Sequence, residues 1–227
     1  MKIILSEWDI RHVVAEAFKI SGKQGSSSYT RKTSSNSSTF DSGNFEYEDV
    51  ADQSPAVRAK AELSDWGGKK ETDPSVKEKL KQYWSAAGPP FSGKTEQAIK
   101  NKSPWSAAFI SFVKSDPFFK SAAHITWKEA AEANTKAINA NPVKFAGKEM
   151  YIALPIDGNT KINIGDNVWR PRDGGSHSDI VVGANKVIGG NLDNTVKSGP
   201  IAHDLVIKKV KVIGPKKEEE KGTGPFV

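Results

Sequence analysis

Apolar residues follow two different spacings along the chain, one before and one after residue 150. Between residues 54 and 140 they recur every three or four positions, which is typical of helices with a buried face. From Met150 onward they form short runs bounded by Gly or Asn, as strands joined by tight turns do. Helices followed by a small antiparallel sheet predict an α+β fold.

The boundaries of the predicted elements come from residues that start or stop regular structure. Ser54-Pro55, Asp73-Pro74 and Ser103-Pro104 each place a capping side chain before a proline, which suits the first turn of a helix. Glycine or proline follows the end of each helix. The predicted helices span residues 54–66, 74–87, 104–113 and 127–140. The predicted strands span residues 150–154, 167–169, 179–182, 186–188 and 205–213.

The pattern divides the chain into four segments. Residues 1–20 carry apolar side chains at helical spacing and predict an N-terminal helix. Residues 21–53 are rich in Ser, Thr, Gly and Asn, which bury too little surface to offset the entropy of ordering, so we expect a flexible linker or arm. Residues 54–214 hold the α+β domain, and residues 215–227 predict a disordered charged tail.

Composition excludes several classes of chemistry. The chain has 227 residues and no cysteine, which excludes disulfides, a thiol nucleophile and cysteine zinc sites. Its four histidines form no HExxH-type pair, so neither a metal nor another cofactor is expected. They are His12, His124, His177 and His203. The net charge of +6 favours anionic partners such as the bacterial wall, but no nucleic-acid motif accompanies the dispersed lysines.

The stretch around the central helix contains the first candidate for catalysis. Trp105 and Ser106 fall in its first turn, where free backbone N–H groups and the positive end of the helix dipole point outward. A hydroxyl there would lie near donors that stabilise negative charge, as an acyl-transfer nucleophile requires. The same residues also fit a plainer interpretation, in which Ser106 only helps to cap a buried helix.

A second group of candidates lies in the strand-rich half. His177 stands at the start of a predicted strand, where it could act as a general base if the sheet packs against the Ser106 helix. Asn191 follows Gly189-Gly190 and supplies an amide that could orient the imidazole. Each also has an ordinary interpretation, as a surface histidine and as a turn asparagine.

Several motifs, taken in order, resemble a known group of proteins. They are Tyr83-Trp84, Pro104-Trp-Ser-Ala-Ala-Phe-Ile-Ser111, Ser121-Ala-Ala-His124, Gly165-Asp166, Ser176-His-Ser-Asp-Ile-Val-Val182 and Ile188-Gly-Gly-Asn191. Together they resemble an uncharacterised bacterial and phage domain family. That family is itself similar to the papain-like peptidoglycan amidases and endopeptidases of the CHAP and NlpC types. The resemblance covers residues 55–212.

The resemblance implies a papain-like fold and a set of roles. In those relatives the central helix opens with Trp-Cys-Ala-Ala-Phe, and the cysteine is the nucleophile. The roles fall on Ser106 as nucleophile, His177 as base and Asn191 as orienter, so a serine replaces the thiol. A serine hydroxyl must lose its proton to a base during attack, whereas cysteine titrates near neutral pH. The residues expected to bind substrate are Trp105, His124, Asp166 and Asp179; His124 also fits a hydrogen-bonded core histidine.

Three functions remain open. The leading expectation is a phage-type peptidoglycan hydrolase that cuts an amide bond of the wall peptide. The second is a phage tail or baseplate protein that keeps an inactive papain-like fold and binds other virion proteins through its N-terminal helix and Ser-rich arm. The third is a non-catalytic wall-binding module. Residues 1–5 are too short a run for a signal peptide and no stretch would span a membrane. We therefore expect synthesis in a host cytoplasm, followed by packaging in a virion or release to the periplasm or cell wall.

Overall fold

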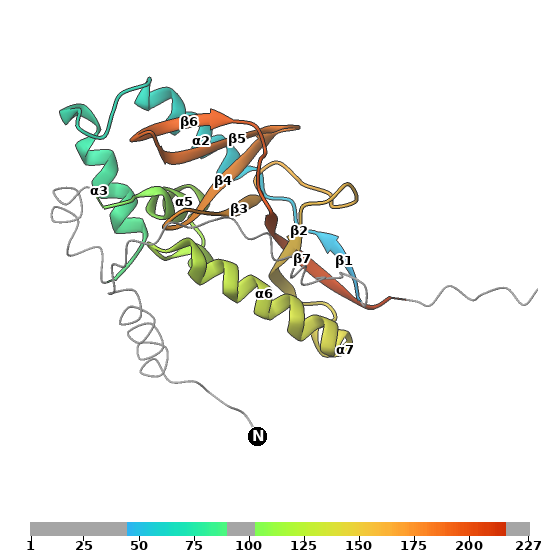
Figure 1. Cartoon of the computed structure of the whole chain (residues 1–227). Helices are drawn as coiled ribbons and strands as arrows, with labels where there is room; N and C mark the ends of the chain where they lie inside the picture. Colours follow the sequence, from blue (N-terminus) through green and yellow to red (C-terminus); the bar gives the residue numbers. More distant parts are fainter. Residues whose placement is uncertain (1–44, 90–102, 217–227) are drawn as a thin grey trace, which may run out of the picture. The chain divides into compact units, whose positions relative to one another are not determined.

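A computed structural model describes residues 45–89 and 103–216, which form an α+β arrangement of helices and one antiparallel sheet (Figure 1). The predicted N-terminal helix, most of the Ser-rich arm and nearly all of the charged tail lie outside these residues. The helices are α2 (Ser54–Trp66), α3 (Lys77–Ala86), α5 (Ser106–Lys114), α6 (His124–Ala140) and α7 (Pro142–Phe145). The strands are β1 (Phe45–Asp49), β2 (Glu149–Pro155), β3 (Asn167–Arg172), β4 (Gly175–Gly183), β5 (Lys186–Leu192), β6 (Thr195–Gly199) and β7 (Leu205–Pro215).

Strand β7 organises the sheet. The strand order is β1-β7-β3-β4-β5-β6, and β2 also pairs with β7. β2 runs along residues 205–211 of β7, whereas β3 pairs with its start and β1 with its end. β3, β4, β5 and β6 follow one another in the chain and pair in that order, so tight turns suffice to connect them.

The two faces of the sheet belong to separate apolar clusters, because alternate residues of a strand point to opposite sides. Ile180 and Val182 of β4 join the cluster that contains the helices, whereas Val181 between them joins the other. In the first cluster α5 packs on β4 and β5, with α2 and α3 against it (Figure 1). Every residue of α5 except Phe112 is buried, so the central helix is enclosed rather than half exposed.

The structure differs from the sequence prediction at several boundaries. Residues 45–49, which we assigned to the Ser-rich arm, form β1 on the edge of β7, because Phe45 of this segment enters the second apolar cluster. Strand β6 was not predicted, since it contributes only Val196 to the core. The central helix begins at Ser106 and not at Pro104, and Trp105 occupies its N-cap position without a side-chain capping bond.

Within the described residues, no helix is both long and apolar enough to cross a membrane. Among the helices of residues 45–89 and 103–216, the longest is α6, which has 17 residues and mixes charged with apolar side chains.

Candidate functional site

Ser106 is the first residue of α5, and its hydroxyl shares a hydrogen bond with a histidine. The Ser106 Oγ lies 2.8 Å from Nε2 of His124, which is the first residue of α6. The exposed fractions of the two residues are 2% and 6%. This pair therefore joins the starts of two helices in a buried setting, and His124 is the partner that the structure gives to the predicted nucleophile.

The environment of His124 keeps its imidazole neutral. Burial, together with the repulsion that Arg172 and a protonated His177 exert on a second positive charge, lowers the pKa of His124 to about 3 against the opposing effect of Asp179. Its Nδ1 is buried without a hydrogen-bond partner. An imidazole in this state is a poor acceptor for a serine proton, because the imidazolium it would form is not stabilised.

His177 and Asp179 lie two residues apart on β4 and therefore point to the same side of the strand. His177 Nε2 donates to Oδ1 of Asp179 at 2.9 Å, and His203 Nε2 donates to Oδ2 at 2.8 Å. Burial raises the pKa of Asp179, but the hydrogen bonds from the two histidines outweigh it and hold this pKa below its usual range. Asp179 is therefore a buried carboxylate that stays charged.

Two adjacent glycines of β5 make room for these side chains. A Cβ atom on Gly189 would lie 1.6 Å from Oδ1 of Asp179 and 3.2 Å from Nε2 of His177. A Cβ atom on Gly190 would lie 2.6 Å from Cβ of Phe109 in α5. Gly189 thus allows the histidine–carboxylate pair to pack on β5, and Gly190 allows α5 to pack on its other side.

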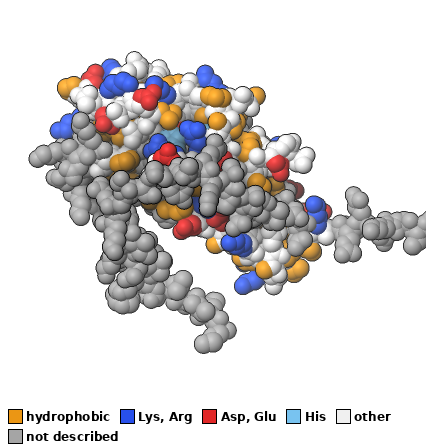
Figure 2. Space-filling view, viewed as in Figure 1, with side chains coloured by type: hydrophobic (Ala, Val, Ile, Leu, Met, Phe, Trp, Pro, Cys, Tyr) orange, Lys and Arg blue, Asp and Glu red, His pale blue; other side chains and the backbone are white. Residues whose placement is uncertain are grey.

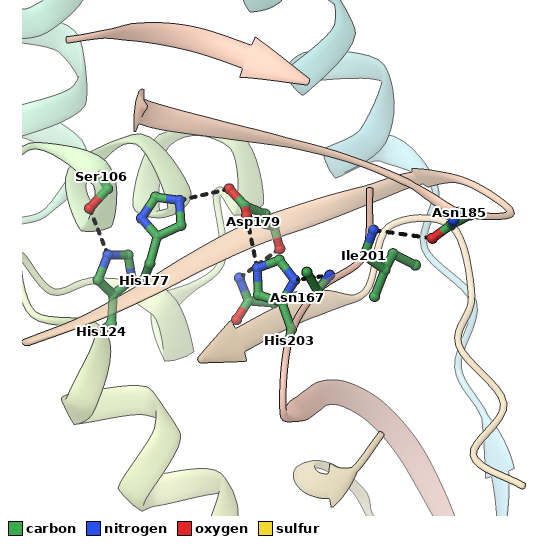
Figure 3. Close-up of polar contacts among 9 residues, drawn as sticks. Ser106, His124, Asn167, His177, Asp179, Asn185, Ile201 and His203 are labelled. Carbon is green, nitrogen blue, oxygen red and sulfur yellow. Dashed lines mark hydrogen bonds and ion pairs between the residues drawn. The ribbon is translucent and has the colours of Figure 1, made fainter. Parts of the chain in front are cut away.

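Figure 3 shows His177 between the Ser106–His124 pair and Asp179. The ring centroids of His124 and His177 are 5.8 Å apart. Nδ1 of His177 is buried without a hydrogen-bond partner, and it faces the Ser106–His124 pair (Figure 3). No hydrogen bond links Ser106 directly to His177 among the described residues. We call the set Ser106, His124, His177, Asp179 and His203 the histidine cluster.

The remaining predicted residues lie in other surroundings. Asn191 adopts a left-handed φ of 60° at the end of β5, and no hydrogen bond between described residues involves its side chain. The side chain that holds the His177 ring by a hydrogen bond is that of Asp179 and not that of Asn191. Trp105 is buried and donates through Nε1 to Glu71 at 2.7 Å, and Asp179 is likewise enclosed, so neither offers an open surface in this structure. His203 was not among the predicted site residues.

Asp166 belongs to a different polar cluster, in which two lysines are buried and the carboxylates are partly buried. Its carboxylate accepts the backbone N–H of Asn163 at 2.8 Å and lies 3.9 Å from Lys208 Nζ. Lys208 Nζ also lies 2.5 Å from Asp49 and 2.8 Å from the carbonyl oxygen of Lys161. Lys114, at the end of α5, donates to the carbonyl oxygen of Gly165 at 3.1 Å. We call Asp49, Lys114, Asp166 and Lys208 the lysine cluster.

Two arginines lie on the strand beside His177. Arg170 is paired directly with His177 across β3 and β4, so the two side chains leave the sheet on the same side. Arg172 is exposed, and its charge acts on His124. Neither arginine forms an ion pair with another described residue, and Arg170 Nε is buried without a partner. Figure 2 shows a histidine side chain at the surface between Lys or Arg side chains.

No group of three or more His, Asp or Glu side chains suited to a metal ion occurs in the part of the chain that the structure describes. The arrangement of Ser106, His177 and Asp179 instead contains the residue types of a serine acyl-transfer site. No protein-family model matches the chain, and searches of curated proteins and of solved structures returned no significant match.

Proposed function

We propose that the chain is a phage-type peptidoglycan hydrolase that cuts an amide bond of the wall peptide, on a papain-like domain whose nucleophile is a serine. The observation that carries the proposal is the position of the Ser106 hydroxyl. It stands at the start of α5, 2.8 Å from one imidazole and beside a second imidazole that a buried carboxylate holds. Nucleophile, base and orienting carboxylate are the parts that acyl transfer needs.

His177 is better suited than His124 to serve as the base. Asp179 stabilises the imidazolium that forms when His177 takes a proton, whereas His124 has no carboxylate partner and a pKa of about 3. The unpartnered Nδ1 of His177 faces Ser106 (Figure 3). For the attack, the hydroxyl would have to exchange its hydrogen bond to His124 for one to this nitrogen.

The reaction would then follow two balanced steps. Ser106 Oγ bonds to the carbonyl carbon of the peptide, its proton passes to His177 Nδ1, and the C–N bond breaks as the leaving amine takes that proton. Backbone N–H groups in the first turn of α5 would stabilise the negative oxygen that develops. A water molecule then attacks the ester carbon, its proton passes to His177, and Ser106 regains the proton as the acid leaves.

Charge around the site favours a substrate with carboxylates. Arg170 and Arg172 have no carboxylate partner among the described residues and lie on the strand next to His177. Peptidoglycan stem peptides carry free carboxylates, which a guanidinium group binds through two parallel hydrogen bonds. The net charge of +6 would add a general attraction to the anionic wall.

A second candidate is a virion structural protein, or a wall-binding module, that keeps the fold without the chemistry. The observation in its favour is the burial of the site, since Ser106, His124, His177 and Asp179 are each 6% exposed or less. In the described arrangement the Ser106 hydroxyl is also paired with the less basic histidine.

The deciding experiment measures soluble fragments released from purified peptidoglycan. We expect the wild type to release fragments with new amine ends, and Ser106→Ala and His177→Ala to reduce the rate at least about a thousandfold. Ser198→Ala, at an exposed serine of β6, is the matched control and should leave the rate unchanged. A wild type that sediments with the wall but releases nothing would favour the binding module. Neither release nor binding would favour assembly.

A second variant tests whether Ser106 can be reached. Because the chain has no cysteine, Ser106→Cys introduces its single thiol. If the thiol is accessible and paired with His177, it should react with iodoacetamide near pH 6 faster than free cysteine, whose pKa is about 8.5. Slow labelling in the native state and fast labelling in urea would show that the position is closed and would count against the hydrolase.

A further inference from the structure

We propose that His203 is a positioning residue of this site. By holding Oδ2 of Asp179, it keeps Oδ1 on the Nε2–H of His177, so that Nδ1 of His177 remains the unprotonated nitrogen that faces Ser106. The catalytic meaning of this unit rests on the proposed hydrolase function. The proposal also states which ring nitrogen of His177 and of His203 carries the proton, and this can be measured whether or not the chain is an enzyme.

The hydrogen bonds fix the tautomer of His203. Its Nδ1 accepts the backbone N–H of Ala202 at 3.2 Å, so this nitrogen carries no proton. Nε2 must then carry the proton of the neutral ring, and it donates to Asp179 Oδ2 at 2.8 Å. The side chains of His203 and Asp179 are only 2% and 3% exposed, so water does not compete for this bond.

The loop that carries His203 is itself anchored on both sides of the histidine. Ile201 donates its backbone N–H to Oδ1 of Asn185 at 3.2 Å, as Figure 3 shows. Asp204 donates its backbone N–H to the carbonyl oxygen of Trp169 at 3.0 Å. The imidazole of His203 is therefore presented to β4 by a loop with a fixed path, as a residue that orients another must be.

The carboxylate of Asp179 has little room to turn. His177 holds one oxygen, His203 holds the other, and Gly189 packs so closely that a Cβ atom there would overlap Oδ1. Removing His203 would leave the second oxygen without its donor in a buried site. Asp179 would then concentrate more negative charge on His177 and strengthen its hold on a proton.

Several charged or titratable groups surround His177, and a test of His203 must leave the other groups unchanged. They are Asp179 on its own strand, Arg170 on β3, His124 at the start of α6 and His203 before β7. A change at His203 alone leaves the first three in place. The titration of His177 therefore reports on the His203–Asp179 contact.

The experiment is side-chain ¹⁵N NMR of the full chain, in which only four histidines give signals. His177→Gln and His203→Gln assign the two resonances. We expect both histidines of the wild type to carry their proton on Nε2 and none on Nδ1 at neutral pH. In His203→Phe the titration midpoint of His177 should rise by about one pH unit. His203→Gln, which keeps a donor near the position of Nε2, should restore the wild-type midpoint.

Two results would overturn the proposal: a wild-type His203 protonated on Nδ1, or a midpoint of His177 that His203→Phe does not move. If His203→Phe fails to fold, the wild-type tautomers and the His203→Gln titration still decide. Where wall hydrolysis is measurable, the acidic limb of the pH profile of kcat/KM in His203→Phe should shift together with the titration midpoint of His177. The expected tautomers in a chain that releases no wall fragments would reject the hydrolase but leave the positioning role of His203 intact.

Discussion

The histidine cluster and the lysine cluster are both polar and largely enclosed, but their polar atoms find partners in different ways. In the lysine cluster, Lys208 contacts two carboxylates and a carbonyl oxygen, and Lys114 donates to the carbonyl oxygen of Gly165. Asp49 Oδ1 accepts no hydrogen bond there, but it lies 2.5 Å from the Lys208 ammonium group and is therefore compensated by an ion pair. In the histidine cluster, Nδ1 of both His124 and His177 is buried without a partner. The first cluster uses its charged groups to hold the chain together, whereas the second leaves two nitrogens unused.

The difference distinguishes a cluster with free acceptor atoms from one without them. Buried polar groups normally have hydrogen-bond partners, and a buried group without one lowers the free energy of unfolding. A role in structure does not account for such a group. An unpaired imidazole nitrogen beside a serine hydroxyl is the acceptor that nucleophilic attack requires. Lys208 already directs its ammonium group at two carboxylates and a carbonyl oxygen, so it has no free donor to offer a substrate. The comparison therefore favours the histidine cluster as the functional site and assigns a structural role to the lysine cluster.

The largest expected effect on stability comes from breaking the lysine cluster at Lys208. Lys208→Met keeps the aliphatic volume but leaves Asp49 and Asp166 without their shared cation. We expect the free energy of unfolding to fall by about 3–5 kcal/mol, measured by urea denaturation. The control is Lys209→Met, at a residue whose partner Glu149 is half exposed, and it should cost less than about 1 kcal/mol. Equal effects of the two variants would contradict the structural role.

A smaller effect is expected from crowding the histidine cluster at Gly189. A methyl group on Gly189→Ala would overlap the carboxylate of Asp179, so β5 or the carboxylate must move. We expect a loss of about 3 kcal/mol in the free energy of unfolding, together with a disturbed His177 signal in NMR. Gly199→Ala is the matched control on β6, because a Cβ atom there meets nothing within 4 Å. It should stay within about 0.5 kcal/mol of the wild type.

The two clusters should respond to acid with opposite signs. Burial lowers the pKa of His124 from 6.5 to about 3, so the unfolded chain binds the extra proton as the pH falls, and stability is lost between these values. Burial raises the pKa of Asp166 from 3.8 to about 6, against opposing contacts with Asn163, Lys208 and Lys114. The folded chain therefore binds the extra proton first, and stability is gained as the pH falls from 6 toward 4.

Urea denaturation between pH 4 and 6 separates these contributions, each of which has a slope of at most about 1.4 kcal/mol per pH unit. Asp166→Asn removes the stability that the wild type gains when Asp166 takes up a proton. The free energy of unfolding of this variant should therefore fall more steeply with decreasing pH than that of the wild type. His124→Gln removes the stability that the wild type loses when His124 of the unfolded chain takes up a proton. The free energy of unfolding of this variant should therefore fall less steeply with decreasing pH than that of the wild type, or rise. Identical pH profiles for the wild type and both variants would contradict the burial of these two groups.

The sequence predicted much of the fold because the elements that matter carry strong local patterns. β2, β3, β4, β5 and β7 contain the predicted strands, and α2 matches its predicted bounds. β1 was missed because its alternating aromatic residues, Phe45 and Tyr47, sit in a segment whose Ser-rich composition argues for disorder. Its order depends on pairing with β7, which lies about 165 residues later in the chain and is not visible locally.

The candidate site was predictable only in part for the same reason. Asp179 could have been chosen as the orienter, because residues two apart on a strand share a face and its carboxylate meets the His177 ring. The Ser106–His124 bond depends on how two helix starts meet, and the His203 contact depends on the path of a loop. Neither contact can be predicted from the spacing of residues in the sequence. Long-range packing decides which of several polar residues become neighbours.

The smallest effect is expected at Asn191, and it discriminates between two assignments of the orienting role. Asn191 has a φ of 60°, a conformation that glycine adopts without strain, so Asn191→Gly should keep the stability within about 1 kcal/mol. If Asp179 orients His177, this variant should change the rate of wall hydrolysis less than about threefold, whereas Asp179→Asn should lower it on the order of a thousandfold or more. The reverse result, with Asn191→Gly inactive and Asp179→Asn active, would restore the roles implied by the resemblance. It would also mean that the site rearranges when substrate binds, because the described Asn191 side chain has no bond to His177.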